Sequence, residues 1–155
     1  MRALAYIRGN YPNIQGRSAS SSLRLSNIMS AMAKYESGRE VSLLEDIRKG
    51  TKTVEIRLRR GKFAQYQPGD RVWLRADTYE GDRIVSSEPR QVLVEVTRVE
   101  PFDSFRELLA GVGYAQVVPR ARNAEEALAQ PYRFYSPEEE RQYGALAIHF
   151  QVIQL

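Results

Sequence analysis

The sequence contains no cysteine and only one histidine, His149. Without thiols the chain can form neither disulfides nor thiolate metal sites, and one imidazole is too few for a typical zinc site. No apolar run approaches the ~18 residues that a membrane-spanning helix requires, and no basic n-region precedes a continuous apolar h-region as in a secretory signal. We therefore expect a soluble, cytoplasmic protein that uses no metal, no cofactor and no membrane partner.

Acidic residues are absent from the first 35 positions, which carry five basic residues. The rest of the chain is nearly neutral, so the formal net charge of +4 says little about the folded body. This segment lacks sustained apolar periodicity and contains a serine-rich run at 18–22, which cannot bury enough apolar surface to offset chain entropy. We predict a tail over residues 1–40, which is disordered, a targeting segment or the result of a translation start placed too early, and a domain over residues 41–155.

Beyond residue 40 the sequence indicates short strands and short helices without a regular βαβ alternation. Residues 53–59 alternate, with Val54, Ile56 and Leu58 on one face and polar side chains on the other, which is typical of a half-buried strand. Similar patterns predict strands over residues 71–76, 90–99 and 145–153, and N-cap signals predict helices that begin near Ser42, Ser104, Asn123 and Ser136. We predict an α+β domain, a small, closed, mixed or antiparallel β-barrel decorated with short helices.

Positive charge is concentrated between residues 48 and 62, where Glu55 is the only acidic residue. The basic residues there are Arg48, Lys49, Lys52, Arg57, Arg59, Arg60 and Lys62. A guanidinium fork matches phosphate oxygens bidentately, so the later part of this run is a candidate ligand for the phosphates of RNA or of a nucleotide, through Arg57, Arg59, Arg60 and Lys62. A solvated hairpin is the other explanation of the run.

Lys52 and Glu55 have a chemical and a structural interpretation. In the first, Glu55 is a general base on water, and Lys52 or Arg57 stabilises an oxyanion or a phosphate. In the second, the three residues form a charge network that holds a strand beside a helix; exposed ion pairs contribute only ~0–1 kcal/mol, so a surface network alone explains the constellation poorly. Thr53 is an alternative nucleophile, and Glu95 is a second carboxylate that could share acid and base roles.

Aromatic side chains allow two interpretations as well. Trp73 alternates with Val72 and Leu74, so it faces away from them and either stacks on a base or is buried beneath a helix. A second group either lines a cleft or anchors a helix to the sheet, and consists of Tyr132, Phe134 and Tyr135. His149 has no second imidazole or thiol beside it and is expected to be structural.

Several separate motifs resemble the ASCH (activating signal cointegrator homology) domain. The longest is Ile47-Arg-Lys-Gly50-Thr-Lys52-Thr-Val-Glu55-Ile-Arg57-Leu. The others, in the same order as in the family, are Gly61-Lys62-Phe63, Pro68-Gly69-Asp70, Phe102-Asp-Ser-Phe105, Tyr132-Arg-Phe-Tyr135-Ser-Pro-Glu-Glu and Tyr143-Gly144-Ala-Leu-Ala-Ile148. The resemblance covers residues 41–153. It implies a PUA-like barrel, an association with RNA and nucleotide handling, and a cleft lined by the Lys and Glu of the K-T-V-E-x-R motif.

The family resemblance leaves the activity open. Some bacterial relatives are amidohydrolases that remove an acyl group from N4-acetylcytidine with a Lys and a Thr three positions later; Lys52 matches, but Glu55 stands where that Thr would be. Other relatives have been proposed as ribonucleases or nucleic-acid-binding modules. We expect an RNA- or nucleotide-interacting domain with a basic cleft around Lys52, Glu55 and Arg57. The alternatives are a small hydrolase that acts on a modified nucleoside, a nucleotide or RNA with Glu55 activating water, and a protein-interaction module.

Overall fold

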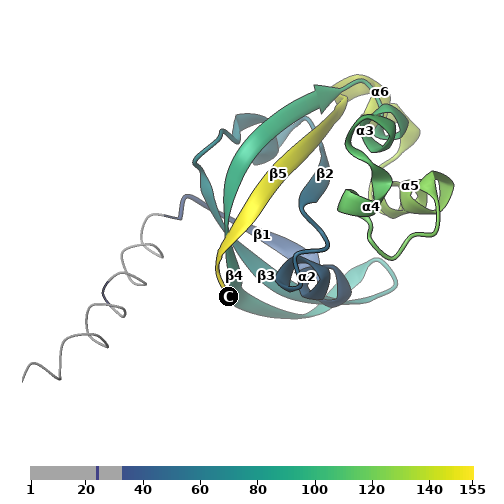
Figure 1. Ribbon diagram of the computed structural model, residues 1–155. Coiled ribbons are helices and arrows are strands. Elements are labelled where there is room, and N and C mark those ends of the chain that lie inside the picture. The colour runs from purple at the N-terminus through teal and green to yellow at the C-terminus, as the bar shows by residue number, and fades with distance from the viewer. Residues whose placement is uncertain (1–23, 25–32) are drawn as a thin grey trace, which may run out of the picture. The chain divides into compact units, whose positions relative to one another are not determined.

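The structure is a computed structural model, and it describes residues 24 and 33–155 of the chain. Residues 33–155 fold into strands and short helices (Figure 1). In chain order these elements are β1 (Tyr35–Glu40), α2 (Val41–Arg48), β2 (Val54–Leu58), the 3-10 helix η1 (Gly61–Gln65), β3 (Arg71–Glu80), β4 (Arg83–Phe102), α3 (Phe105–Val112), α4 (Tyr114–Val117), α5 (Ala124–Tyr132), α6 (Pro137–Tyr143) and β5 (Ala145–Gln154).

The strands form one mixed sheet in the order β1-β3-β4-β5-β2. β1 runs parallel to β3, whereas all other neighbours are antiparallel. The long strand β4 pairs with both β3 and β5, and register shifts interrupt both pairings, one between Leu74 and Ala76 and another between Val96 and Arg98. Such irregularities bend a strand and increase its twist, and the sheet accordingly curls around its own interior (Figure 1).

The curled sheet does not close into a barrel. β1 and β2 are its two edges, and they do not pair with each other among the described residues. The prediction of an α+β domain is therefore confirmed, whereas the prediction of a closed barrel is wrong. The physical reason is that charged side chains occupy the gap: Arg57 of β2 donates from Nη2 to the carbonyl of Gly38 on β1 at 3.3 Å. A side-chain bridge replaces the main-chain ladder that closure requires.

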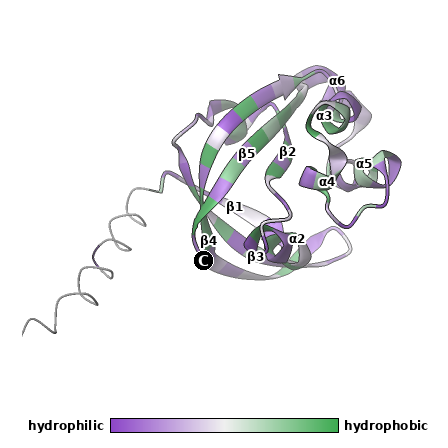
Figure 2. Ribbon diagram, in the orientation of Figure 1, coloured by the Kyte–Doolittle hydropathy of each residue, from purple (hydrophilic) through white to green (hydrophobic). Residues whose placement is uncertain are grey.

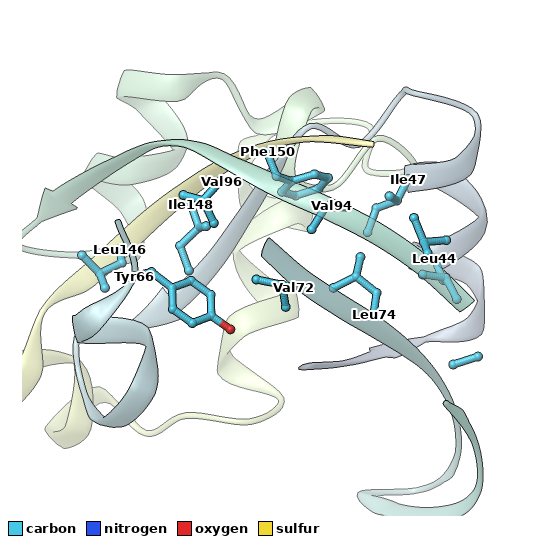
Figure 3. Packing of buried hydrophobic residues seen from close by; sticks show 12 residues of the cluster. Leu44, Ile47, Tyr66, Val72, Leu74, Val94, Val96, Leu146, Ile148 and Phe150 are labelled. Atoms are coloured by element: carbon cyan, nitrogen blue, oxygen red, sulfur yellow. The ribbon is translucent and has the colours of Figure 1, made fainter. Parts of the chain in front are cut away.

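Two apolar clusters lie on opposite faces of the sheet. The first fills the inside of the curl, where Leu44 and Ile47 of α2 meet β3, β4 and β5 (Figure 3). The second joins β2 to α3, α4 and α5. The strands show this division as alternating hydrophobic and hydrophilic residues (Figure 2). Ile148 and Leu146 of β5 belong to the inner cluster, and they pair with Glu55 and Arg57 of β2.

Cross-strand partners point to the same face of a sheet, so this register aims Glu55 and Arg57 into the curl. Val54, Ile56 and Leu58, on the other face of β2, pack against the helices. The alternation predicted for β2 is confirmed, but on its polar face Glu55 is buried and Arg57 is half-buried. Glu55 is therefore a carboxylate in the interior.

Residues 35–40 correct the predicted boundary at residue 40, because they form β1 and pair with β3 from Val72 to Asp77. The inward side chains of β1 are Ser37 and Arg39, which give no apolar alternation that a sequence pattern could detect. The rest of the predicted tail lies outside the described residues, except for residues 24, 33 and 34.

The predicted helix starts are mostly confirmed. Ser104, Asn123 and Ser136 each accept a hydrogen bond from an amide three residues later, and Ser136 forms a full capping box with Glu139. The start at Ser42 is wrong, because α2 begins at Val41 and its cap is Glu40, which makes no side-chain capping bond.

Candidate functional site

A pocket of about 300 Å³ lies where the barrel fails to close. Residues 37–40 of β1 and 55–57 of β2 line it from the two sheet edges. The remaining walls come from η1, from the β3–β4 hairpin and from the end of α5 with the segment after it, and include Lys62, Phe63, Arg75, Asp77, Tyr79, Ile84, Pro131, Phe134 and Tyr135. The volume is at the lower end of the range for small-molecule sites, so the pocket has room for one small ligand.

The charged residues of the K-T-V-E-x-R motif satisfy the backbone along the free edge of β2. Nζ of Lys52 donates to the carbonyl of Val54 at 2.8 Å, and the amide of Ile56 donates to Oε1 of Glu55 at 3.1 Å. Nη1 of Arg57 lies 3.5 Å from the carbonyl of Ile56. Buried backbone groups without partners are costly, so these side chains take the place of the neighbouring strand that β2 lacks. The motif is thus part of the fold as well as of the pocket.

Glu55 is the centre of the charge cluster. Its buried carboxylate forms an ion pair with Nε of Arg39 and lies 3.8 Å from Nζ of Lys52 and 3.5 Å from Nη1 of Arg57. Burial alone would raise the pKa of this carboxyl group, but the three cations outweigh it and lower the pKa to about 2. Glu55 is therefore ionised throughout the neutral pH range.

Lys52 lies behind Glu55 and is not a lining residue of the pocket. Its side chain is only 2% exposed, and Nζ also donates to the carbonyl of Val117 in α4 at 2.6 Å. Burial lowers the pKa of Lys52 to about 8, against the opposing effect of Glu55. The predicted contact between Lys52 and a ligand is not what the structure shows. Lys52 instead joins β2 to α4, which agrees with the structural interpretation.

Arg39 is the main residue that the sequence analysis missed, because it lay in the predicted tail. Its Nη1 donates to Oγ of Ser37 at 2.7 Å and to the carbonyl of Gly38 at 2.6 Å. Burial lowers the pKa of Arg39 to about 10, so the guanidinium remains charged at neutral pH. The only sequence signal was a basic residue two positions before α2.

Gly38 permits the close approach of β1 to its neighbours. A Cβ atom at this position would lie 2.0 Å from Oδ2 of Asp77 and 2.7 Å from Nη2 of Arg75. No larger residue fits unless that ion pair moves. The absence of a side chain at Gly38 therefore leaves room for the Asp77–Arg75 ion pair.

Arg57 and Lys62 bring further positive charge to the pocket. Arg57 lies over the ring of Phe63 at 5.1 Å, and Lys62 lies over the same ring at 5.4 Å. Burial and the neighbouring cations, Arg39 first among them, lower the pKa of Lys62. Lys62 is thus a partly desolvated cation beside other cations at this side of the pocket.

Asp77 and Arg75 form a neutral pair on the opposite wall. Arg75 contacts the carboxylate bidentately, with Nε 2.7 Å from Oδ1 and Nη2 3.0 Å from Oδ2, and Ser87 donates to Oδ1 at 2.6 Å. Burial would raise the pKa of Asp77, but these bonds lower it. The sequence analysis ended this strand at Ala76, whereas β3 continues through Asp77 to Glu80.

The other predicted phosphate ligands lie elsewhere. Arg60 pairs with Glu139 at 2.8 Å and lies between the rings of Tyr135 and Tyr143. Arg59 lines a separate depression of about 570 Å³ with Arg141 and Tyr143. Neither arginine lines the main pocket.

The remaining candidates also lie outside the pocket. Trp73 is 8% exposed and pairs with Leu93 across the sheet, which fits the burial interpretation. Glu95 forms a surface pair with Arg71, and Nε2 of His149 lies 2.7 Å from Oε1 of Glu100. Oγ1 of Thr53 lies 3.5 Å from Oε1 of Gln116, and Thr53 does not line the pocket either.

The aromatic group divides between the two interpretations. The hydroxyl of Tyr132 donates to Glu140 at 2.7 Å and its ring packs on Phe105, so this residue anchors the helices. Phe134 and Tyr135 line the pocket. Phe134 also meets Tyr79 edge-on at 5.8 Å, which joins the β3–β4 hairpin to the segment after α5.

The described part of the chain contains no group of three or more His, Cys, Asp or Glu side chains that could hold a metal ion. None of the helices in that part is long and apolar enough to span a membrane.

The domain is a PUA-like α+β domain, with an open sheet and a charged pocket between the two edge strands of that sheet. The profile of the ASCH domain matches residues 42–154, and the chain therefore belongs to the ASCH domain family. This confirms the resemblance seen in the sequence motifs. A search among curated proteins gave no match.

Solved structures agree with this assignment. The hypothetical protein PH0355 is 30% identical, with 77% of this chain and 98% of that chain covered and a TM-score of 0.66. Protein PF0455 from Pyrococcus furiosus is also 30% identical, over 78% and 98% of the two chains, with a TM-score of 0.62. An ASCH domain from Lactobacillus crispatus JV V101 shares the fold at 15% identity, over 92% and 99% of the chains, with a TM-score of 0.51.

Proposed function

We propose that this ASCH domain binds RNA or a nucleotide in the pocket between β1 and β2. The observation that carries the proposal is the convergence of Arg39, Arg57 and Lys62 on a pocket whose walls also hold aromatic rings. Cations attract phosphate, and aromatic faces stack on bases in a way that tolerates any sequence.

The positive charge of the pocket exceeds its negative charge. Four cations line it, Arg39, Arg57, Lys62 and Arg75, against the carboxylates of Glu40, Glu55 and Asp77. Asp77 is already matched by Arg75, and Glu40 by Arg133 at 3.1 Å. An anionic ligand group would complement the remaining charge.

The aromatic walls supply the second half of a nucleotide site. Phe63 lies beneath Arg57 and Lys62, and Phe134 and Tyr135, which follow α5, also line the pocket. The ring of Phe134 is accessible, since the residue is 40% exposed. A base entering the pocket could stack on one of these rings while its phosphate meets the cations.

The geometry favours binding over hydrolysis by Glu55. A general base works best when its pKa lies near the operating pH, and three cations lower the pKa of Glu55 to about 2. Its conjugate acid would be strong, so its pull on a proton of water is weak. We therefore assign Glu55 the role of holding Arg39 and Arg57 in place.

Titration of short single-stranded RNA and of nucleoside monophosphates at one fixed salt concentration tests the proposal. The pocket variant Arg57→Gln with Lys62→Gln is compared with a control of equal charge loss, Arg59→Gln with Arg141→Gln, at the separate depression. Two lost charge-assisted hydrogen bonds, at roughly 1.5–3 kcal/mol each, predict about 10²-fold or more weaker binding for the pocket variant. Equal weakening in both variants would show that binding reflects only overall charge.

A further inference from the structure

The pocket has a charged inner end and an apolar mouth. At the inner end, Ser37, Arg39, Glu55 and Asp77 are all buried. At the mouth, Phe134 and Ile84 are 40% and 42% exposed. This gradient orients any ligand that carries one ionic and one flat, apolar part.

The cations at the inner end are not balanced by protein. Arg39, Arg57 and Lys52 surround the single carboxylate of Glu55. Asp77 contributes little balance because Arg75 and Ser87 already bind it. Unmatched buried charge is costly, so a ligand group with more than one negative charge fits this end best.

Donors remain for such a group. The bonds of Arg39 to other described residues use Nε and Nη1, which leaves the two N–H groups of Nη2. Both hydrogen bonds of Arg57 to backbone carbonyls are long, at 3.3 and 3.5 Å, and can give way to an anion. Guanidinium groups are suited to phosphate because their paired N–H groups match two of its oxygens.

A terminal phosphate meets these requirements better than an internal one. A phosphomonoester carries a charge of about −1.5 to −2 at neutral pH and has three free acceptor oxygens. An internal phosphodiester carries one charge and continues into a sugar on both sides, whereas the inner end is walled by the edges of β1 and β2. The pocket therefore favours the phosphate at the end of a nucleic-acid chain over a phosphodiester in its middle.

We propose, building on the proposed function, that the pocket binds the terminal phosphate of a nucleotide. The phosphate lies inward at Arg39 and Arg57, and the base lies outward against Phe134 or Tyr135. Two kinds of ligand carry a terminal phosphate next to a base: a free mononucleotide and the phosphorylated end of an RNA strand.

Matched ligands test the orientation on the full chain. Calorimetric titrations compare nucleoside 5′-monophosphates with the same nucleosides, and one short RNA with a 5′-phosphate, a 3′-phosphate or hydroxyl ends. We expect the phosphorylated form to bind at least about 10²-fold more tightly, which corresponds to two charge-assisted bonds. Inorganic phosphate should compete with it. If the phosphorylated form is preferred only among the mononucleotides, or only among the RNA ends, that result identifies which of the two ligands the pocket binds. Either result supports the inference.

A variant links that preference to the pocket. Arg57→Gln should remove most of the preference for the phosphorylated form, because it weakens binding of that form far more than binding of the hydroxyl form. Lys49→Gln, at an exposed residue paired with Glu45, is the control and should preserve the preference. Equal affinity of phosphorylated and hydroxyl forms in the wild type overturns this inference while leaving the proposed function intact. No binding of any nucleotide or RNA overturns the proposed function itself.

Discussion

Arg57 on β2 donates to the carbonyl of Gly38 on β1 across the gap between the two sheet edges, with 3.3 Å between Nη2 and the oxygen. The same guanidinium lies 3.5 Å from Glu55 and over the ring of Phe63. One side chain thus holds the open seam of the sheet together and faces the pocket that the seam creates. Stability and binding are coupled at this position.

Glu55→Gln is predicted to destabilise the domain strongly. The substitution removes the only negative charge among Arg39, Lys52 and Arg57, and breaking a buried ion pair from one side costs about 3–5 kcal/mol. Urea-induced unfolding gives the free energy of unfolding. The control is Glu95→Gln, whose surface pair with Arg71 is worth about 0–1 kcal/mol. A loss below 1 kcal/mol for Glu55→Gln would contradict the assignment of a central structural charge.

Acid should destabilise the wild type through Glu55. The pKa of this carboxyl group falls from 4.5 when exposed to about 2 in the folded state, so the folded state binds its proton less readily than the unfolded one. The stabilisation is present above pH 4.5 and is lost as the pH falls through about 2. The free energy of unfolding of Glu55→Gln should therefore depend less on pH over this window than that of the wild type. Parallel curves of unfolding free energy against pH for the two proteins would refute the lowered pKa of Glu55.

Lys52→Met is predicted to lower stability without removing a ligand contact. The substitution leaves the carbonyls of Val54 and Val117 without their buried donor and removes one cation beside Glu55. The free energy of unfolding should fall by more than about 1 kcal/mol, while nucleotide affinity of the folded protein changes less than it does in Arg57→Gln. Thermal melts and titrations at a temperature well below the melting transition separate the two effects. An affinity loss as large as that of Arg57→Gln, in a variant of unchanged stability, would restore Lys52 as a ligand-contacting residue.

The start of the domain can be tested by truncation. A chain that begins at Lys34 keeps β1, whereas a chain that begins at Val41 loses the strand together with Arg39. We predict cooperative thermal unfolding for the first and loss of cooperativity or of several kcal/mol for the second. The sequence alone predicted a tail over residues 1–40, but removal of that whole segment would also remove β1. Equal stability of both truncated chains would show that β1 contributes nothing.

Sequence patterns located β2 and the centre of the site because both depend on local signals. The alternation of Val54, Ile56 and Leu58 specifies a strand, and the charged residues between them form the family motif. The same patterns missed β1, because a parallel edge strand with Ser37 and Arg39 facing inward has no apolar period. Its register depends on β3, more than thirty residues away in the chain.

The sequence could not predict which of the basic residues line the pocket. Lys52, Arg57 and Arg59 lie within eight positions of one another, yet only Arg57 lines the main pocket. Lys52 is drawn toward α4 by the carbonyl of Val117, and Arg59 lies beyond the end of β2 beside α6. Long-range partners, not spacing, decide these outcomes.

The central claim is that the seam between β1 and β2 is the ligand-binding site, and amide chemical-shift mapping by NMR tests it most directly. A nucleoside 5′-monophosphate is titrated into the labelled protein at fixed pH and salt. We predict that the largest shifts occur at Gly38, Arg57 and Phe63, which line the pocket. Shifts that cluster instead at Arg59, Phe102 and Gly144, around the separate depression, would contradict the account.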